Sequence, residues 1–182
     1  MKTTLLLAVA LSAFTNITQA ETPIEADWTY NGNGFDRSNP DSIGETTTED
    51  GVTTTRTTMA GLGGWAGMSS NVEVPAGKSL NFRLRSETPI PLFVVRIQDS
   101  SMQTLEYRFG YRMPGKWEGK LGAWQFYGIY LDKEAKAYWK GNADGIIEFP
   151  IKSVQVFIGN TKDEPAPAEV TFQTKDWTTS VE

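Results

Sequence analysis

The chain contains neither cysteine nor histidine among its 182 residues. Without histidine, the serine–histidine and cysteine–histidine nucleophile systems are excluded, and so are zinc sites that use imidazole ligands. Without cysteine there are no disulfides, so a domain of this kind must be stabilised by its hydrophobic core rather than by cross-links. The absence of cysteine also excludes a lipoprotein anchor of the lipobox type.

Long hydrophobic runs are missing as well, with one exception at the start. Lys2 supplies a positive charge, Leu5–Phe14 is a short apolar run, and Thr18-Gln19-Ala20 forms a small-residue cleavage site. This order predicts a signal peptide over residues 1–20. The run is too short to span a bilayer. We therefore expect a secreted or periplasmic protein with no membrane insertion, in which residues 21–182 form one domain.

Positive charge is scarce overall. The full chain carries 17 basic residues against 22 acidic ones, a formal net charge of −5. Nucleic-acid binding needs a cationic surface, so this balance argues against a nucleic-acid partner. The arginines are locally concentrated, however, which leaves an acidic ligand open.

The most regular pattern in the chain is an alternation between apolar and polar residues from Ser79 to Arg112. Successive side chains of a strand point to opposite faces of a sheet, so the pattern predicts strands with one face in the core. The inward set includes Leu80, Phe82, Leu84, Phe93, Val95, Ile97, Leu105, Tyr107 and Phe109. We expect the outward set to gather on one face of a sheet: Arg83, Arg85, Arg96, Gln98 and Arg108.

Short strands separated by turn signals continue along the rest of the chain. Glu45–Met59 is rich in threonine, and its Asp50-Gly51 pair predicts a two-residue hairpin turn. Lys133–Lys140 has the composition of one or two turns of helix ending at Gly141. Strands are expected at Ile146–Phe149 and Glu169–Thr174, among others. The sequence predicts an all-β, two-sheet antiparallel β-sandwich.

Several of these segments, in this order, resemble the galactose-binding-like jelly rolls, a fold shared by many carbohydrate-binding modules of secreted polysaccharide-degrading systems. The resemblance extends from about Trp28 to Trp177. The segments that carry it are Trp65-Ala66-Gly67, Ala76–Ser86, Pro91–Asp99, Val154–Gly159 and Val170-Thr171-Phe172. It implies a glycan bound across the concave sheet or in loops at one end, and a separate polysaccharide-degrading enzyme as a possible partner.

Sugar recognition requires flat aromatic rings and planar polar side chains. Arginine and glutamine pair with neighbouring hydroxyls, and arginine pairs bidentately with a uronic acid carboxylate. The predicted ligand-binding residues are therefore Arg83, Arg85, Arg96, Gln98 and Arg108, with Trp117 or Trp124 as the stacking surface. The alternative is that the arginines are solvated surface charges. Each tryptophan is equally compatible with burial in the core.

The resemblance also implies a structural calcium ion, but the sequence does not place it. Asp36, Asp41, Glu45 and Asp176 are near the ends that would converge, without the alternate spacing of a calcium loop. The cofactor therefore stays open, and no catalytic residue is assigned.

Three other functions remain open. A glycosidase could use a pair of carboxylates among Asp99, Glu106, Glu118 and Asp132, and a lyase could use Tyr107 or Tyr111 as its base. Both tyrosines share the face assigned to the core, which argues against the lyase. A structural or adhesive surface protein is the third alternative. The favoured hypothesis is a non-catalytic carbohydrate-binding domain.

Overall fold

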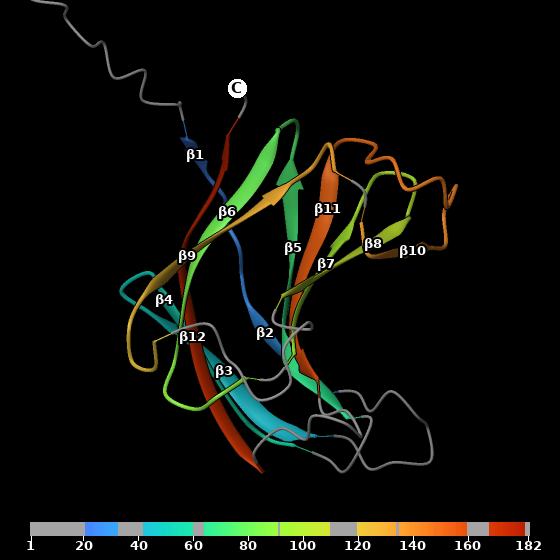
Figure 1. The fold of residues 1–182 in the computed structure, drawn as a ribbon. Helices are drawn as coiled ribbons and strands as arrows, with labels where there is room; N and C mark the ends of the chain where they lie inside the picture. Colours follow the sequence, from blue (N-terminus) through green and yellow to red (C-terminus); the bar gives the residue numbers. More distant parts are fainter. Residues whose placement is uncertain are drawn as a thin grey trace, which may run out of the picture.

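The protein folds as two antiparallel six-stranded sheets packed face to face (Figure 1). The computed structural model describes residues 21–32, 42–59, 64–90, 92–109, 120–133, 135–159 and 168–180. The predicted signal peptide lies outside these residues. The described residues contain no α-helix, and therefore no helix that is long and apolar enough to cross a membrane.

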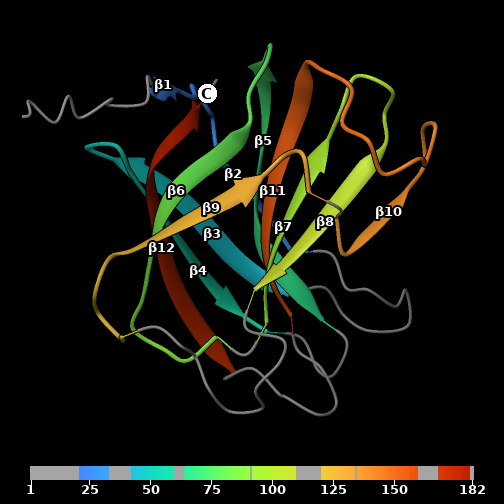
Figure 2. The ribbon, with the colours of Figure 1, turned by 45° about the horizontal axis from the view of Figure 1, so that its top comes forward.

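Sheet A has the strand order β3-β4-β12-β6-β9, and β1 pairs with β12 beside this path. Its longest strand, β12, runs the length of the sheet in both views of the ribbon (Figures 1 and 2). The strands are β1 (Glu21–Pro23), β3 (Ile43–Glu49), β4 (Val52–Thr58), β6 (Ser79–Ser86), β9 (Gln125–Tyr130) and β12 (Glu169–Ser180).

Sheet B has the strand order β10-β8-β7-β11-β5-β2. All of its pairings are antiparallel, as in sheet A. The strands are β2 (Thr29–Asn31), β5 (Trp65–Val74), β7 (Phe93–Gln98), β8 (Thr104–Phe109), β10 (Ala137–Trp139) and β11 (Ile151–Gly159). The predicted all-β, two-sheet antiparallel sandwich is confirmed.

The core lies between the sheets and is rich in aromatic rings. Phe82 on β6 stacks on Trp177 of β12 at 4.3 Å between centroids, and Trp28 packs against Trp177 at 5.0 Å. Phe93 of β7 meets Phe172 of β12 edge to face at 6.2 Å. Burial of a side chain of this size contributes about 1.5–3 kcal/mol, so this cluster locks the two sheets together without cross-links.

The threonine-rich hairpin forms as predicted. Glu49 pairs with Val52, so Asp50 and Gly51 are the only residues in the turn. Both have positive φ, 49° and 73°, as a type I′ turn requires. The hydroxyls of Thr46 and Thr55 are 2.9 Å apart across the two strands.

Two predicted elements are wrong. Lys133–Lys140 is not a helix: its Ala137–Trp139 forms strand β10, which pairs with β8. Helix propensity is a weak preference, and an available strand edge overrides it over so few residues. Ile146–Phe149 is an irregular segment rather than a strand, and the strand begins at Ile151.

A buried carboxylate holds this irregular segment in place. Asp99, at the end of β7, is fully buried. It accepts hydrogen bonds from Ser101 N (3.0 Å) and Oγ (2.8 Å) and from Gln103 N (3.0 Å) and Nε2 (3.2 Å). A fifth bond comes from Glu148 N at 3.1 Å, so Asp99 joins the β7–β8 turn to the segment before β11.

Candidate binding face

The predicted arginine surface is divided between the two sheets. Arg83 and Arg85 lie on β6 in sheet A, whereas Arg96, Gln98 and Arg108 lie on β7 and β8 in sheet B. Each set points away from the core, so the two sets face opposite sides of the sandwich. The prediction that all five share one face is wrong, because the chain changes sheets between Ser86 and Phe93.

In sheet B the arginines are tied to a buried carboxylate. Glu106 Oε2 accepts from Arg96 Nε at 2.8 Å, and Glu106 Oε1 accepts from Arg108 Nε at 2.5 Å. The side chain of Glu106 is only 2% exposed, and that of Arg96 is 18% exposed. Two charge-assisted hydrogen bonds therefore satisfy an otherwise costly buried charge.

Aromatic rings complete the enclosure of Arg96. Its guanidinium carbon is 5.1 Å from the Trp65 ring centroid, 5.3 Å from that of Trp139 and 5.1 Å from that of Phe157. Cation–π attraction is strongest where the cation has lost its water. Arg96 thus links β5, β7, β8, β10 and β11, and this geometry fits a packing role better than contact with a ligand.

The outward face of sheet A carries exposed aromatic rings instead. Phe126 and Tyr130, both on edge strand β9, are 61% and 57% exposed. Gly128 lies between them on the same face. A Cβ at Gly128 would lie 3.2 Å from Asn81 Oδ1 and 3.8 Å from Cε1 of Phe126, so glycine allows the Asn81 and Phe126 side chains to approach the strand closely here.

Arg83 and Arg85 border this aromatic row. Arg83 pairs with Phe126 in the strand register, and its Nε is 3.3 Å from Asp176. Arg85 Nε donates to Gln173 Oε1 at 2.8 Å and its guanidinium lies 5.2 Å from the Trp124 ring centroid. The side chain of Arg83 is 48% exposed, and that of Arg85 is 34% exposed.

Together these residues form one surface, which we call the β9 face: Arg83, Arg85, Trp124, Phe126 and Tyr130. Three members were predicted from the sequence, and the structure brings them together. Phe126 and Tyr130 were missed, although their alternation with the inward Tyr127 and Ile129 was a usable signal. The combination of flat apolar rings with planar hydrogen-bond donors suits a ligand that has both apolar faces and hydroxyls.

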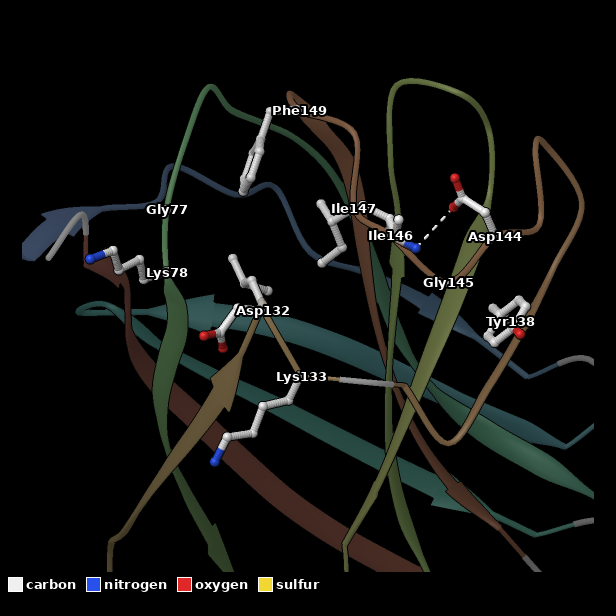
Figure 3. Close-up of a pocket in the computed structure, with 11 residues that line it drawn as sticks. Gly77, Lys78, Asp132, Lys133, Tyr138, Asp144, Gly145, Ile146, Ile147 and Phe149 are labelled. Carbon is white, nitrogen blue, oxygen red and sulfur yellow. Dashed lines mark hydrogen bonds between the residues drawn. The ribbon is translucent and has the colours of Figure 1, made fainter.

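A groove, which we call the end groove, lies at one end of the sandwich (Figure 3). This end groove has a volume of about 520 Å³, and its walls include Lys78, Asp132, Asp144 and Phe149. Asp144 Oδ1 accepts a hydrogen bond from Ile146 N at 2.9 Å (Figure 3). This carboxylate therefore stabilises the loop on which it lies.

The carboxylates considered for a glycosidase occupy different environments. Asp99 and Glu106 are buried and hydrogen-bonded, and Asp132 is exposed in the end groove. Glu118 lies outside the described residues, as do Trp117 and Tyr111. The described residues therefore offer no facing pair of solvent-accessible carboxylates from that set.

A calcium site does not fit the described residues. Glu45 pairs with Arg56 at 3.6 Å and Asp176 pairs with Arg83, so each of these carboxylates faces an arginine. Asp36 and Asp41 lie outside the described residues. In the part of the chain that the structure describes, no three acidic side chains are grouped to hold a metal ion.

Tyr107, the candidate lyase base, points into the sandwich. Its hydroxyl is buried and has no hydrogen-bond partner among the described residues. Burial raises the pKa of Tyr107 to about 12. A base must lose its proton near the working pH, and this environment opposes that loss.

Tyr107 should make folding sensitive to strong alkali. Its pKa is about 10 in an unfolded chain and about 12 in the fold. Its contribution to the free energy of unfolding is therefore complete below pH 10 and is lost as the pH rises from 10 to 12. Denaturant unfolding at pH 9, 10 and 11 should show a smaller alkaline loss in Tyr107→Phe than in the wild type. The exposed-site control Tyr130→Phe should keep the wild-type loss; equal losses in both variants would contradict the assignment.

The sheet order and the geometry of the two faces define a jelly-roll β-sandwich, and solved structures share it. The family 11 carbohydrate-binding module from Clostridium thermocellum, in complex with a β-1,3-1,4-mixed-linked tetrasaccharide, matches with a TM-score of 0.59 and 9% identity. The match covers 88% of this chain and 96% of that one. The family 11 module of a cellulosomal cellulase from the same organism matches with a TM-score of 0.60 and 9% identity, over 90% of this chain and 96% of that one.

A solution structure of CtCBM11 gives the same result, with a TM-score of 0.58 and 10% identity over 92% of this chain and 98% of that one. The predicted jelly-roll β-sandwich is therefore confirmed as the fold. No protein-family model matches the sequence, and no curated protein does.

Proposed function

We propose that this protein is a secreted, non-catalytic carbohydrate-binding domain that holds a polysaccharide or oligosaccharide on the β9 face. The observation that carries the proposal is the pair of exposed rings, Phe126 and Tyr130, on one face of an edge strand with Gly128 between them. Such rings cover the apolar faces of pyranoses. Apolar side chains that are grouped on one exposed face often mark a binding site.

The cations beside the rings favour an acidic or densely hydroxylated glycan. Arg83 and Arg85 present guanidinium groups that are only partly engaged with neighbouring side chains. Lys175 adds a third charge, with its Nζ 4.7 Å from the Trp124 centroid. Paired donation to vicinal hydroxyls or to a uronate carboxylate is the chemistry that this arrangement can supply.

The fold supports the proposal by analogy. One structural neighbour was solved with a mixed-linked tetrasaccharide, and another belongs to a cellulosomal cellulase. By the same analogy we propose that this domain works outside the cytoplasm beside a separate polysaccharide-degrading enzyme. Fold likeness does not transfer a site, so the residues must be tested directly.

Removing the central ring should abolish most of the binding. Phe126→Ala is expected to weaken glycan affinity by about tenfold or more, because truncating a central aromatic contact typically costs more than 1 kcal/mol. The measurement is retardation of residues 21–182 in native gels containing a panel of neutral and acidic polysaccharides. The side chain is exposed, so the thermal midpoint of Phe126→Ala should stay within a few degrees of that of the wild type.

The matched control is Ile43→Ala, which removes a 77% exposed apolar side chain from the opposite edge of sheet A. Its retardation should equal that of the wild type. If Phe126→Ala binds every retained glycan as well as the wild type does, the β9 face is not the binding surface. If no polysaccharide retards the wild type, the proposed function itself is wrong.

A further inference from the structure

A groove lies beside the β9 face, between the edges of the two sheets. It has a volume of about 260 Å³ and is lined by Arg108 and Phe109 of β8, Gly128 and Tyr130 of β9, and the following Lys133 and Lys136. Both β8 and β9 lie on the near side of the molecule in Figure 2. We call it the edge groove.

Both strands that border the edge groove lie at or near the edge of their sheet. β9 is the last strand of sheet A and pairs only with β6. β10 pairs with Thr104–Glu106 of β8, whereas β7 pairs with β8 as far as Phe109. Within the described chain, the end of β8 at Arg108 is therefore paired with β7 and not with β10. The groove therefore lies where no further strand of the described chain extends either sheet.

The charged residues that line the edge groove, Arg108, Lys133 and Lys136, are all basic. Lys133 and Lys136 form no ion pair within the described part of the chain, and no carboxylate is among the residues that line the groove. Arg108 forms an ion pair with the buried Glu106. Lys133 Nζ lies 4.4 Å from the centroid of Tyr130, so this cation is held at the junction with the β9 face.

We propose that the edge groove is a subsite for the anionic substituent, carboxylate or sulfate, of a sugar whose neighbours lie on the β9 face. The inference rests on the proposed function, because Tyr130 belongs both to that face and to the groove. The volume is below the 300–1,000 Å³ typical of pockets for larger ligands, and therefore suits a single substituted sugar unit. Lys133 and Lys136 supply point charges for either anion.

The test compares a charge-removing pair in the edge groove with a matched pair elsewhere. Lys133→Gln/Lys136→Gln removes two charges at the groove. Lys120→Gln/Lys152→Gln removes two charges from positions that do not line it: Lys120 is exposed, and Lys152 is partly exposed and pairs with Glu73. Calorimetric titration at low salt uses an oligogalacturonide as the acidic probe and a neutral β-glucan oligosaccharide as the second probe.

The groove variant is expected to bind the oligogalacturonide about tenfold more weakly than the wild type, with a reduced salt dependence. Its affinity for the neutral probe should be unchanged, and the control pair should resemble the wild type with both probes. An equal loss in the two variants would overturn the proposal, because the effect would then come from overall charge. No loss in the groove variant would overturn it as well.

A free inorganic anion is the other source of the same chemistry. A competition experiment distinguishes a sugar-borne anion from a free inorganic one. Sodium sulfate and sodium chloride are added at equal ionic strength, and the displacement of the oligogalacturonide is compared. Equal competition supports a subsite that requires the sugar. Specific displacement of the oligogalacturonide by sulfate at low millimolar concentration would show an inorganic-anion site and overturn the glycan assignment. Neutral-glycan binding that depends on Phe126 would survive either result, so failure of this inference is distinguishable from failure of the proposed function.

Discussion

Arg96→Ala is expected to lower the free energy of unfolding by about 3 kcal/mol, because removing one partner of a buried ion pair leaves the other charge uncompensated. Glu106 is 2% exposed and would keep Arg108 as its one arginine partner. The substitution also empties the space between the rings of Trp65, Trp139 and Phe157. Denaturant unfolding followed by tryptophan fluorescence measures the loss.

The matched control is Arg83→Ala. Its side chain is 48% exposed and pairs with Asp176, whose side chain is 56% exposed, so the free energy of unfolding should change by no more than about 0.5 kcal/mol. The two variants should behave in opposite ways in a binding assay: Arg83→Ala loses affinity, whereas the Arg96→Ala protein that remains folded keeps it. A stable Arg96→Ala variant that fails to bind glycan would place the site on sheet B and contradict this assignment.

Asp99→Ala is expected to have a comparably large effect, a loss of about 3 kcal/mol or more. Five donors from Ser101, Gln103 and Glu148 converge on this carboxylate. Ser101 Oγ, Gln103 N and Gln103 Nε2 each have a second acceptor, so the loss falls mainly on Ser101 N and Glu148 N. Each donor left without an acceptor costs about 1–3 kcal/mol unless water replaces the lost oxygen. The measurement is again denaturant unfolding. Asp132→Ala, at an exposed carboxylate, should stay within about 0.5 kcal/mol of the wild type.

Asp99→Asn separates the hydrogen-bond role from simple loss of volume. The amide preserves the shape but sets a donating NH2 group against donors such as Gln103 Nε2 and Glu148 N. It should therefore lose at least half as much stability as Asp99→Ala. If Asp99→Asn is as stable as the wild type, the carboxylate does not hold the segment before β11.

The fold was predictable because the alternation of apolar and polar residues along a strand indicates which side chains are buried. Leu80, Phe82 and Leu84 are all fully buried, as the pattern required. Alternation does not state which sheet a strand joins. β6 and β7 have the same apolar-and-arginine pattern, yet β6 pairs with β12 and β9, whereas β7 pairs with β11 and β8. The sheet assignment depends on pairings between segments far apart in the sequence.

The site was predictable only in part for the same reason. Arg83 and Arg96 occupy equivalent places in the pattern, but only Arg96 is covered by rings, and these come from three remote strands. The sequence does not single out Phe126, because its exposure follows from the position of β9 at the edge of sheet A. Propensity also failed at β10, where pairing with β8 outweighed the helix-favouring composition.

The most direct test of the account follows the indole N–H signals of the tryptophans by NMR while the best-retained glycan is added. Trp124 belongs to the β9 face on sheet A, and Trp65 and Trp139 enclose Arg96 on sheet B. Saturable shifts of Trp124 and of the backbone amides of Phe126 and Gly128, with Trp65 and Trp139 unmoved, are the predicted result. Shifts confined to Trp65 and Trp139 would contradict it and move the ligand to the opposite side of the sandwich.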